Sequence, residues 1–313
     1  MTLSISDLIS VLGAVALAGV GGELFLKGVL GAAVILRVPK LLIATTLAAF
    51  ATSSPELTVS SVAALAGKPE IGLGDALGSN VVNIALIFGL ALLFGPIHIK
   101  LSELGRDFAL ALGVPLLTLW FVRDGVVSRG EGGVLLLFFV FWLGLMIRAG
   151  LASRESTENA TDGHPLRSLM LGVAGLAALV IAGRLFVMGA TGIATAFGVD
   201  AYVIGATLVA VGTSLPELVT VLLARLRGHD DIGVGTLLGS NLFNGLAIVG
   251  VAASIHPIAA SPSEIAVALG IGLASLLLLI PGQSALIGRG RGLLLQAVYV
   301  LFVAATLVVG RTH

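Results

Sequence analysis

Long apolar runs separated by short polar breaks dominate the sequence. Ten of these runs approach or exceed the roughly 20 residues that an α-helix needs to cross a lipid bilayer. They cover residues 8–35, 40–66, 71–95, 106–122, 132–150, 167–197, 201–226, 233–256, 264–281 and 291–310. Glycine, proline and charged residues occupy the breaks, as is typical of turns between helices. The pattern predicts an all-α, polytopic membrane protein with ten transmembrane helices.

One stretch of the sequence occurs twice. Residues 43–90 align with residues 204–251 without a gap, and 22 of the 48 positions are identical. Both copies contain a Pro-Glu pair, at Glu56 and Glu217, and both contain a Gly-Ser-Asn triplet followed by a second asparagine. A self-match at a fixed spacing of 161 residues indicates a duplicated structural unit.

The duplication divides the chain into two predicted repeats of five helices, residues 1–152 and 166–313, joined by a linker loop at 153–165. Because five is an odd number, the second repeat starts from the opposite side of the membrane, and the repeats are inverted. Loops on one side carry eleven Lys and Arg residues, and those on the other side carry four. The positive-inside rule therefore predicts that both termini lie outside a plasma (inner) membrane.

Composition agrees with a lipid environment and excludes several classes of protein. Hydrophobic residues make up 57% of the chain and charged residues 11%, against about 25% charged residues in a typical soluble domain. The formal net charge of zero argues against binding to nucleic acid. The chain has no cysteine, which excludes disulfides and thiolate metal sites, and no cofactor is expected.

Glu56 and Glu217 lie in the middle of predicted membrane helices. A charged side chain at that depth costs ~2.5–3.5 kcal/mol on insertion scales, so each glutamate is a candidate for function. The alternative is a structural ion pair with a basic residue inside the membrane, for which Lys27 and Arg184 are available. Neither basic residue recurs at the spacing of 161 residues, whereas the glutamates do. The repetition favours a functional role.

Other groups that carry oxygen recur beside the glutamates. Pro55 and Pro216 interrupt the helical hydrogen bonds and free backbone carbonyls. Hydroxyl groups lie one turn before each glutamate, and a serine lies four residues before an asparagine in the next helix of each copy: Thr52, Ser53, Thr213, Ser214, Ser79, Asn83, Ser240 and Asn244. Hydroxyls bonded to their own backbone and asparagines bonded between helices are the alternatives. As a set, these oxygens suit calcium, which takes about six to eight oxygen ligands.

The motif pair TSSPE…GSNVVN and GTSLPE…GSNLFN resembles the two alpha repeats of the calcium/cation antiporter superfamily, which includes the sodium/calcium exchangers. The resemblance implies an ion site at the middle of the membrane, with Glu56 and Glu217 as the central calcium ligands. It implies that hydroxyl groups ring the site and that two alanines offer backbone carbonyls: Thr52, Thr213, Ser53, Ser214, Ser79, Ser240, Ala49 and Ala210. Asn83 and Asn244 complete the predicted ligands.

The function implied by the resemblance is secondary active antiport. Calcium would be exchanged for Na⁺ or H⁺ by alternating access around the site, without a cofactor and without enzymatic chemistry. We expect a monomer whose partners are the lipid bilayer, calcium and the monovalent cation. A passive cation channel and an antiporter for another divalent cation are the alternatives.

The sequence departs from the family pattern at the positions that bear on the coupling ion. Sodium-coupled relatives carry an aspartate at one of the two positions held here by Asn83 and Asn244. Two glutamates that lie close together without a cation repel each other, so an empty site would tend to take up protons. The charge count therefore favours proton coupling, while the surrounding motifs resemble the sodium/calcium branch more closely.

Asp75 is the second departure, because the family commonly has asparagine there. Two hypotheses follow. In the first, which we favour, Asp75 caps the start of its helix. In the second, it lies on the face of Ser79 and Asn83 and lines the outer access path. The segment Gly-Leu-Gly-Asp at 72–75 also matches a short signature of intramembrane aspartyl proteases. Such chemistry needs a second aspartate, which follows a tyrosine in those proteases, and no tyrosine in this chain is followed by aspartate.

Overall fold

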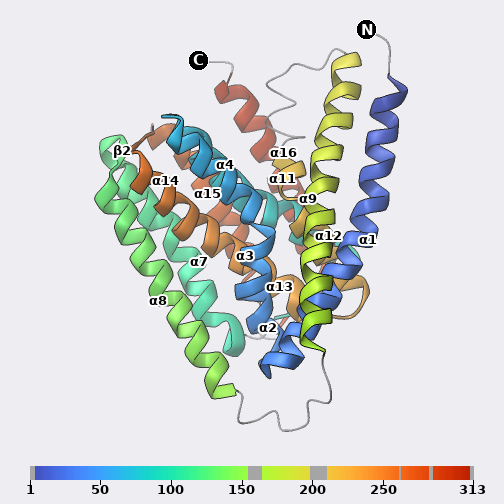
Figure 1. Cartoon of the computed structure of the whole chain (residues 1–313). Coiled ribbons are helices and arrows are strands. Elements are labelled where there is room, and N and C mark those ends of the chain that lie inside the picture. Colours follow the sequence, from blue (N-terminus) through green and yellow to red (C-terminus); the bar gives the residue numbers. More distant parts are fainter. Residues whose placement is uncertain are drawn as a thin grey trace.

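The structure, a computed structural model, describes residues 4–99, 101–153, 164–197, 210–260, 262–281 and 285–310, and it is built almost entirely of helices (Figure 1). The α-helices are α1 (Ile5–Leu36), α2 (Lys40–Ile43), α3 (Ala49–Thr52), α4 (Ser54–Leu65), α5 (Pro69–Val81), α6 (Gly89–Leu93), α7 (Leu101–Phe121), α8 (Arg129–Ser153), α9 (Pro165–Ala196), α11 (Ala210–Thr213), α12 (Leu215–Leu226), α13 (Asp230–Leu242), α14 (Val249–Ile255), α15 (Pro262–Leu278) and α16 (Arg289–Gly310). Segments of π-helix cover Ala44–Ala48, Val82–Phe88 and Phe243–Ile248, and a 3-10 turn covers Val122–Asp124.

Helices lie in all ten predicted ranges, although residues 201–209 of one range fall outside the described residues. Six helices in the described part are long and apolar enough to cross a membrane: Ile5–Leu36, Pro69–Leu93, Leu104–Asp124, Arg129–Ala152, Pro165–Ala196 and Asp230–Ile255. Lys40–Thr52 and Ile265–Leu278 are apolar but shorter. Most of the linker predicted at 153–165 also falls outside the described residues; Ser153 ends α8 and Pro165 begins α9.

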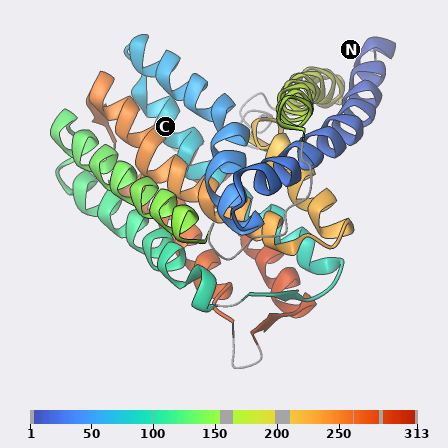
Figure 2. The same cartoon turned by 60° about the horizontal axis from the view of Figure 1, so that its bottom comes forward.

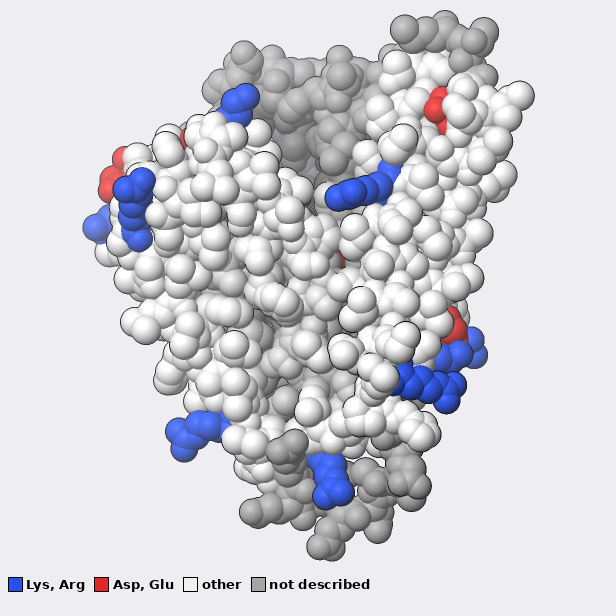
Figure 3. All heavy atoms as spheres, viewed as in Figure 1, with Lys and Arg blue, Asp and Glu red and all other residues white. Residues whose placement is uncertain are grey.

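The surface has the character of a membrane protein. Figure 3 shows Lys and Arg gathered toward the two ends of one face, with a largely uncharged surface between them. Many large apolar side chains on the outer helices are exposed, such as Leu12, Leu137 and Val300 at 69%, 68% and 66%. A soluble protein rarely exposes so much contiguous apolar area, so lipid is the solvent that covers this band.

The two longest helices, α1 and α9, pack against each other along much of their length (Figure 2). Glycines make their close contact possible. A Cβ atom added at Gly28 would lie 2.5 Å from the Cα of Gly172, and one added at Gly175 would lie 2.3 Å from the backbone of Phe25. Membrane helices often associate through close backbone contact at small residues. Lipid tails are as apolar as the helices, so the hydrophobic effect does not drive the helices together and van der Waals packing must do so.

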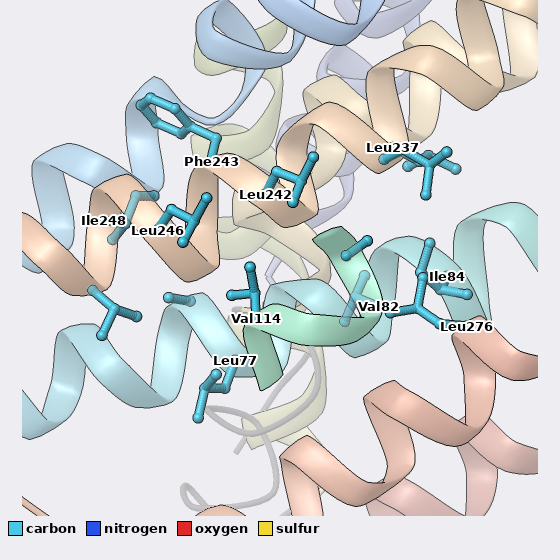
Figure 4. Packing of buried hydrophobic residues seen from close by; sticks show 14 of the residues in the cluster. Leu77, Val82, Ile84, Val114, Leu237, Leu242, Phe243, Leu246, Ile248 and Leu276 are labelled. Atoms are coloured by element: carbon cyan, nitrogen blue, oxygen red, sulfur yellow. The ribbon is translucent and has the colours of Figure 1, made fainter. Parts of the chain in front are cut away.

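The buried centre of the molecule consists of the continuous segments α5–α6 and α13–α14. In these segments 72% and 83% of the most apolar window is buried, against 22% in α8 and α9. Leu77, Val82 and Ile84 of the first segment and Leu237, Leu242 and Leu246 of the second face one another, with Val114 of α7 and Leu276 of α15 beside them (Figure 4). The segments that carry the repeated Gly-Ser-Asn motif are therefore shielded from lipid.

Short strands tie the two halves of the chain together. β1 (Ile97–His98) pairs with β4 (Leu286–Ile287), and β2 (Val126–Val127) pairs with β3 (Ile258–Ala259), both antiparallel. Each pair takes one strand from each half. The first and last helices share one end of the molecule, where α1 begins and α16 ends (Figure 1). The middle of the chain lies at the opposite end, where α8 ends and α9 begins.

The glycine contact between α1 and α9 yields a stability prediction. Gly28→Ala should lower the free energy of unfolding by about 1–3 kcal/mol, because the added methyl group overpacks the contact with Gly172. Thermal unfolding of the purified protein in detergent would measure this.

Gly19→Ala in the same helix is the matched control. Nothing described lies within 4 Å of a Cβ atom at Gly19, so this variant should be neutral or slightly stabilising. Equal effects of the two substitutions would contradict the packing described for α1 and α9.

Candidate ion-binding site

The repeated Pro-Glu pairs lie where two membrane helices are interrupted. α3 ends at Thr52 and α4 restarts at Ser54, while Ser53 between them has φ −86° and ψ 8°. Ser214 separates α11 from α12 in the same way, with φ −85° and ψ 13°. Proline is tolerated in the first turn of a helix, where its missing N–H would lack a partner anyway. Each proline therefore lies in the first turn of a new helix, and the predicted interruption of the helical hydrogen bonds is present.

This arrangement places both glutamates in the first turn of a helix, Glu56 in α4 and Glu217 in α12. The N-terminal end of a helix carries a partial positive charge that stabilises carboxylates. Both side chains are almost fully buried, at 1% exposure each. The helix termini therefore supply part of the stabilisation that water would otherwise give.

The structure brings the two glutamates together. The Ser53 hydroxyl, from the first half of the chain, donates to Oε1 of Glu217 in the second half at 3.0 Å. Ser240 of α13 donates to the same oxygen at 3.4 Å. The carboxylate of Glu56 lies close enough to that of Glu217 to interact with it electrostatically. One polar site therefore contains the central residues of both motifs.

The two halves do not contribute equally to this site. Oε1 of Glu217 accepts from the hydroxyls of Ser53 and Ser240, whereas the hydroxyls of Ser79 and Ser214 have no hydrogen-bond partner among the described residues. Ser79 and Ser214 are the positions that correspond to Ser240 and Ser53 in the other half. The duplicated sequence therefore forms an asymmetric site.

The threonines and alanines of the motifs lie beside the helix interruption. The Thr52 hydroxyl donates to the backbone carbonyls of Ala48 at 3.1 Å and Ala49 at 3.3 Å, which is the backbone-bonded alternative considered for it. Ser54 donates to the carbonyl of Ala51 at 2.7 Å, the carbonyl that Pro55 leaves without a helical N–H. In the second half, Ala210 and Thr213 begin and end α11.

The asparagines lie in π-helical segments. Asn83 belongs to Val82–Phe88 and Asn244 to Phe243–Ile248, and both are buried at 1% exposure. A π-helical turn widens the helix and frees carbonyls, and such turns are frequent at functional sites. Gln296 of α16 donates to two carbonyls in the first of these segments, those of Ala85 at 3.2 Å and Leu86 at 2.8 Å.

Asn80 and Asn241, which were not predicted as site residues, join the two halves. The side-chain amide of each donates to the backbone carbonyl of the other at 3.3 Å. Asn83 also donates to Oδ1 of Asn241 at 3.1 Å, so it bonds between helices while its own Oδ1 has no described partner. Asn80 and Asn241 recur at the spacing of 161 residues, a signal that could have identified them.

Asp75 is not a helix cap. α5 begins at Pro69 and its cap residue is Lys68, so Asp75 lies two turns inside the helix, beyond the N–H groups that a cap can reach. The capping hypothesis is therefore wrong. Two threonines, Thr220 and Thr236, were also missed; both are fully buried at 0% exposure, and their hydroxyl oxygens have no described partner.

Pairing with a basic residue does not explain the buried glutamates. Lys27 bonds to Glu23 on its own helix at 3.3 Å, and Glu23 also bonds to Arg227 at 2.8 Å. Within the described part of the chain, neither Glu56 nor Glu217 forms an ion pair, and none is found for Arg184. The alternative of a structural ion pair with Lys27 is therefore wrong.

The chemistry of the unpartnered atoms identifies the kind of ion that fits. Almost all are oxygens, and all belong to the repeated segments: Glu56 Oε2, Asp75 Oδ2, Ser79 Oγ, Asn80 Oδ1, Asn83 Oδ1, Ser214 Oγ, Glu217 Oε2, Thr220 Oγ1, Thr236 Oγ1, and Oδ1 and Nδ2 of Asn244. Unpartnered buried polar groups are costly, at about 1–3 kcal/mol each. Carboxylate, amide and hydroxyl oxygens suit hard cations such as Ca²⁺. The searched residues contain no cluster of three His, Cys, Asp or Glu side chains, so they offer no typical transition-metal site.

Comparison with known proteins places this arrangement among ion exchangers. Residues 6–148 and 167–308 match the family described as "Sodium/calcium exchanger protein". CaxA of Alkalimonas amylolytica, a protein named as an antiporter, is 37% identical over 71% of this chain and 72% of its own length. Inner membrane protein YrbG of Escherichia coli is 37% identical over 70% of this chain and 71% of its own length. A solved structure of the sodium-calcium exchanger NCX_Mj, soaked with 2.5 mM Na⁺ and 0.1 mM Ca²⁺, covers 96% of this chain and 98% of its own, with a TM-score of 0.83 and 30% identity.

The hydrogen bond from Ser53 to Glu217 yields a prediction. Ser53→Ala should lower the free energy of unfolding by about 1.5–3 kcal/mol, because it removes the shorter of two bonds to a buried carboxylate. Thermal unfolding in the absence of calcium would measure the loss. Ser214→Ala, at the corresponding position, removes a hydroxyl with no described partner and should cost less. A larger loss in Ser214→Ala than in Ser53→Ala would contradict the asymmetric site.

Proposed function

The chain belongs to the sodium/calcium exchanger protein family, and we propose that it is a secondary active antiporter that moves calcium across the membrane in exchange for a monovalent cation. The observation that carries the proposal is the pair of buried glutamates, one from each copy of the repeat, surrounded by unpartnered oxygen atoms. No basic residue among those described balances their charge, so a bound cation is the natural counter-charge. Relatives named as an antiporter and as a sodium-calcium exchanger support the same class of function.

Calcium would be held between the two halves of the chain. Glu56 and Glu217 would supply the charge, and hydroxyl, amide and backbone oxygens the remaining ligands: Thr52, Thr213, Ser53, Ser214, Ser79, Ser240, Asn83, Asn244, Ala49 and Ala210. The bond from Ser53 to Glu217 supports this assignment because it connects the two motifs directly. A monovalent cation would occupy the same carboxylates after calcium leaves.

The transport cycle would use two inverted halves that cross the membrane ten times, residues 1–152 and 166–313. The repeated order of interrupted helix, Pro-Glu pair and π-helical segment supports this architecture. Inverted halves provide one access route from each side to a common site at mid-membrane, which suits alternating access. A passive channel does not need alternating access. Trans-stimulated calcium uptake is expected of an antiporter but not of a channel, so this measurement would distinguish them.

The protein would lie in the plasma (inner) membrane with both termini outside. The excess of Lys and Arg in the loops of one side supports this orientation, as does the name of the inner membrane protein YrbG. α1 begins and α16 ends at one end of the molecule, in agreement with an even number of crossings (Figure 1). A monomer would be sufficient for function, because one chain supplies both halves of the site.

Protons are the coupling ion that the charges of this site favour. Two glutamates supply two negative charges, so two protons replace one calcium ion with the charge unchanged. Three sodium ions would require more negative charge than Glu56 and Glu217 provide, and Asn83 and Asn244 are neutral. The mechanism proposed is therefore exchange of calcium for protons at the two carboxylates.

The first functional prediction concerns the glutamates. Glu56→Gln and Glu217→Gln should each reduce calcium flux in proteoliposomes to background, because each removes half of the negative charge while keeping the side-chain volume. Asp107→Asn is the matched control. Asp107 is also buried, but its carboxylate has partners: it accepts a hydrogen bond from Trp142 Nε1 at 3.0 Å and lies 3.5 Å from Nε of Arg106. The amide of the variant can still accept the bond from Trp142. Calcium flux near the wild-type rate in both glutamine variants would refute the site.

The second functional prediction concerns the coupling ion. In calcium-loaded vesicles with a clamped membrane potential, a pH gradient alone should drive calcium efflux. An inward sodium gradient at equal pH on both sides should not. Asn244→Asp adds a carboxylate to the site and should shift the protein toward sodium. Sodium-driven efflux in the wild type that persists in the presence of a protonophore would overturn proton coupling.

A further inference from the structure

Asp75 is a third acidic side chain close to the proposed calcium site. It precedes Ser79 by four residues and Asn83 by eight on the same helical segment, so all three share one face of α5 and its continuation. α5 packs against α4, the helix that carries Glu56. The searched residues contain no group of three acidic, histidine or cysteine side chains that could hold one metal ion, so Asp75 does not complete a three-carboxylate site with the glutamate pair.

Nothing described in the structure accounts for the carboxylate of Asp75. Its position inside α5 rules out a cap, and its buried Oδ2 atom has no hydrogen-bond partner. Among the described residues it also forms no ion pair. A carboxylate oxygen that is buried without a partner is costly, and a glutamate of the same charge on the neighbouring helix increases that cost. A cation close to Asp75 would remove both penalties.

Asp75 lies on one side of the site. α4 leads from Glu56 toward the end of the molecule where α1 begins (Figure 1). α5 starts near that end, because only three residues separate it from α4, and it packs back along α4. Asp75 is therefore about 6 Å nearer to that end than Ser79, at 1.5 Å per helical residue. It is also less deeply buried than Glu56. In the orientation proposed above, this is the outer side of the membrane.

The opposite side of the site carries no matching acid. The position that corresponds to Asp75 in the second half is Thr236, and the position that corresponds to Val59 is Thr220. Both threonines are fully buried, and their hydroxyl oxygens have no described partner. The layer next to the glutamates is therefore acidic on the side of Asp75 and neutral, with hydroxyl groups, on the side of Thr236.

We propose that Asp75 forms a second cation-binding position on the outer access route, where it holds a calcium ion that is entering the site at Glu56 and Glu217 or leaving it. The proposal rests on the calcium antiport and the orientation proposed above. A negative charge on the route concentrates cations near the site and strengthens their binding from that side. Thr236 gives no such assistance on the other route, so the two faces of the transporter would differ in their apparent affinity for calcium.

The test compares calcium transport from each face. Right-side-out and inside-out membrane vesicles that contain the wild type or Asp75→Asn would be assayed over a range of calcium concentrations. From the outer face, the variant should need roughly three- to tenfold more calcium for half-maximal transport, at an unchanged maximal rate. From the inner face, half-maximal transport should occur at the wild-type concentration.

Two further variants control for charge and for folding. Asp75→Glu keeps the carboxylate and should retain the wild-type asymmetry between the faces. Asp75→Thr introduces the residue that the other half carries at this position, in the same helical context, and should show the same change at the outer face only. It replaces Asp75→Asn as the test if Asp75→Asn folds poorly. Thermal unfolding in detergent would verify that each protein is folded.

The outcomes separate this inference from the proposed function. Absence of calcium transport in the wild type would refute the function itself. With an active wild type, an equal change on both faces would mean that Asp75 acts on the central site, and no change on either face would mean that it binds no cation. Either result would overturn the proposal.

Discussion

The cost of holding two carboxylates away from water inside a membrane protein governs this structure. Glu56 and Glu217 are almost fully buried, and no basic residue in the described chain compensates for them. The fold lowers that cost with the N-terminal ends of α4 and α12 and with the hydroxyls of Ser53 and Ser240. These groups do not cancel the negative charge. The site is therefore stabilised most when a cation is bound, which is the property that a carrier of cations needs.

The interruptions of the helices follow from the same constraint. A continuous membrane helix satisfies all of its own backbone groups and leaves none for an ion. The breaks at Ser53 and Ser214 and the π-helical segments at 82–88 and 243–248 disturb that pattern only where protein surrounds the backbone. Broken helices of this kind concentrate polar groups at mid-membrane in many transporters. The lipid-facing helices α1, α8 and α9 carry no such interruptions over their described lengths.

Duplication explains the resemblance between the halves, and divergence explains the differences that matter for function. Asn80 and Asn241 keep an equal exchange of hydrogen bonds across the two copies. Other positions have diverged: Asn83 bonds to Asn241 whereas Asn244 has no described partner, and Ser53 bonds to Glu217 whereas Ser214 has no described partner. Asp75 corresponds to Thr236. A transporter whose two sides face different ion concentrations has no reason to keep these positions identical.

The sequence by itself determined the class of the protein, the helical ranges and the identity of the two glutamates. Apolar runs of membrane length leave little choice of fold, and a motif repeated at a constant spacing marks the residues that act together. Only the tertiary structure decided which partner each polar group has, because such partners come from helices far apart in the chain. In the structure, Ser53 donates a hydrogen bond to Glu217, Lys27 forms an ion pair with Glu23, and Asn80 bonds to Asn241. The structure also shows that Asp75 lies inside its helix and not at the start. Spacing along a chain predicts which face of a helix a residue occupies, but the packing of helices decides what that face meets.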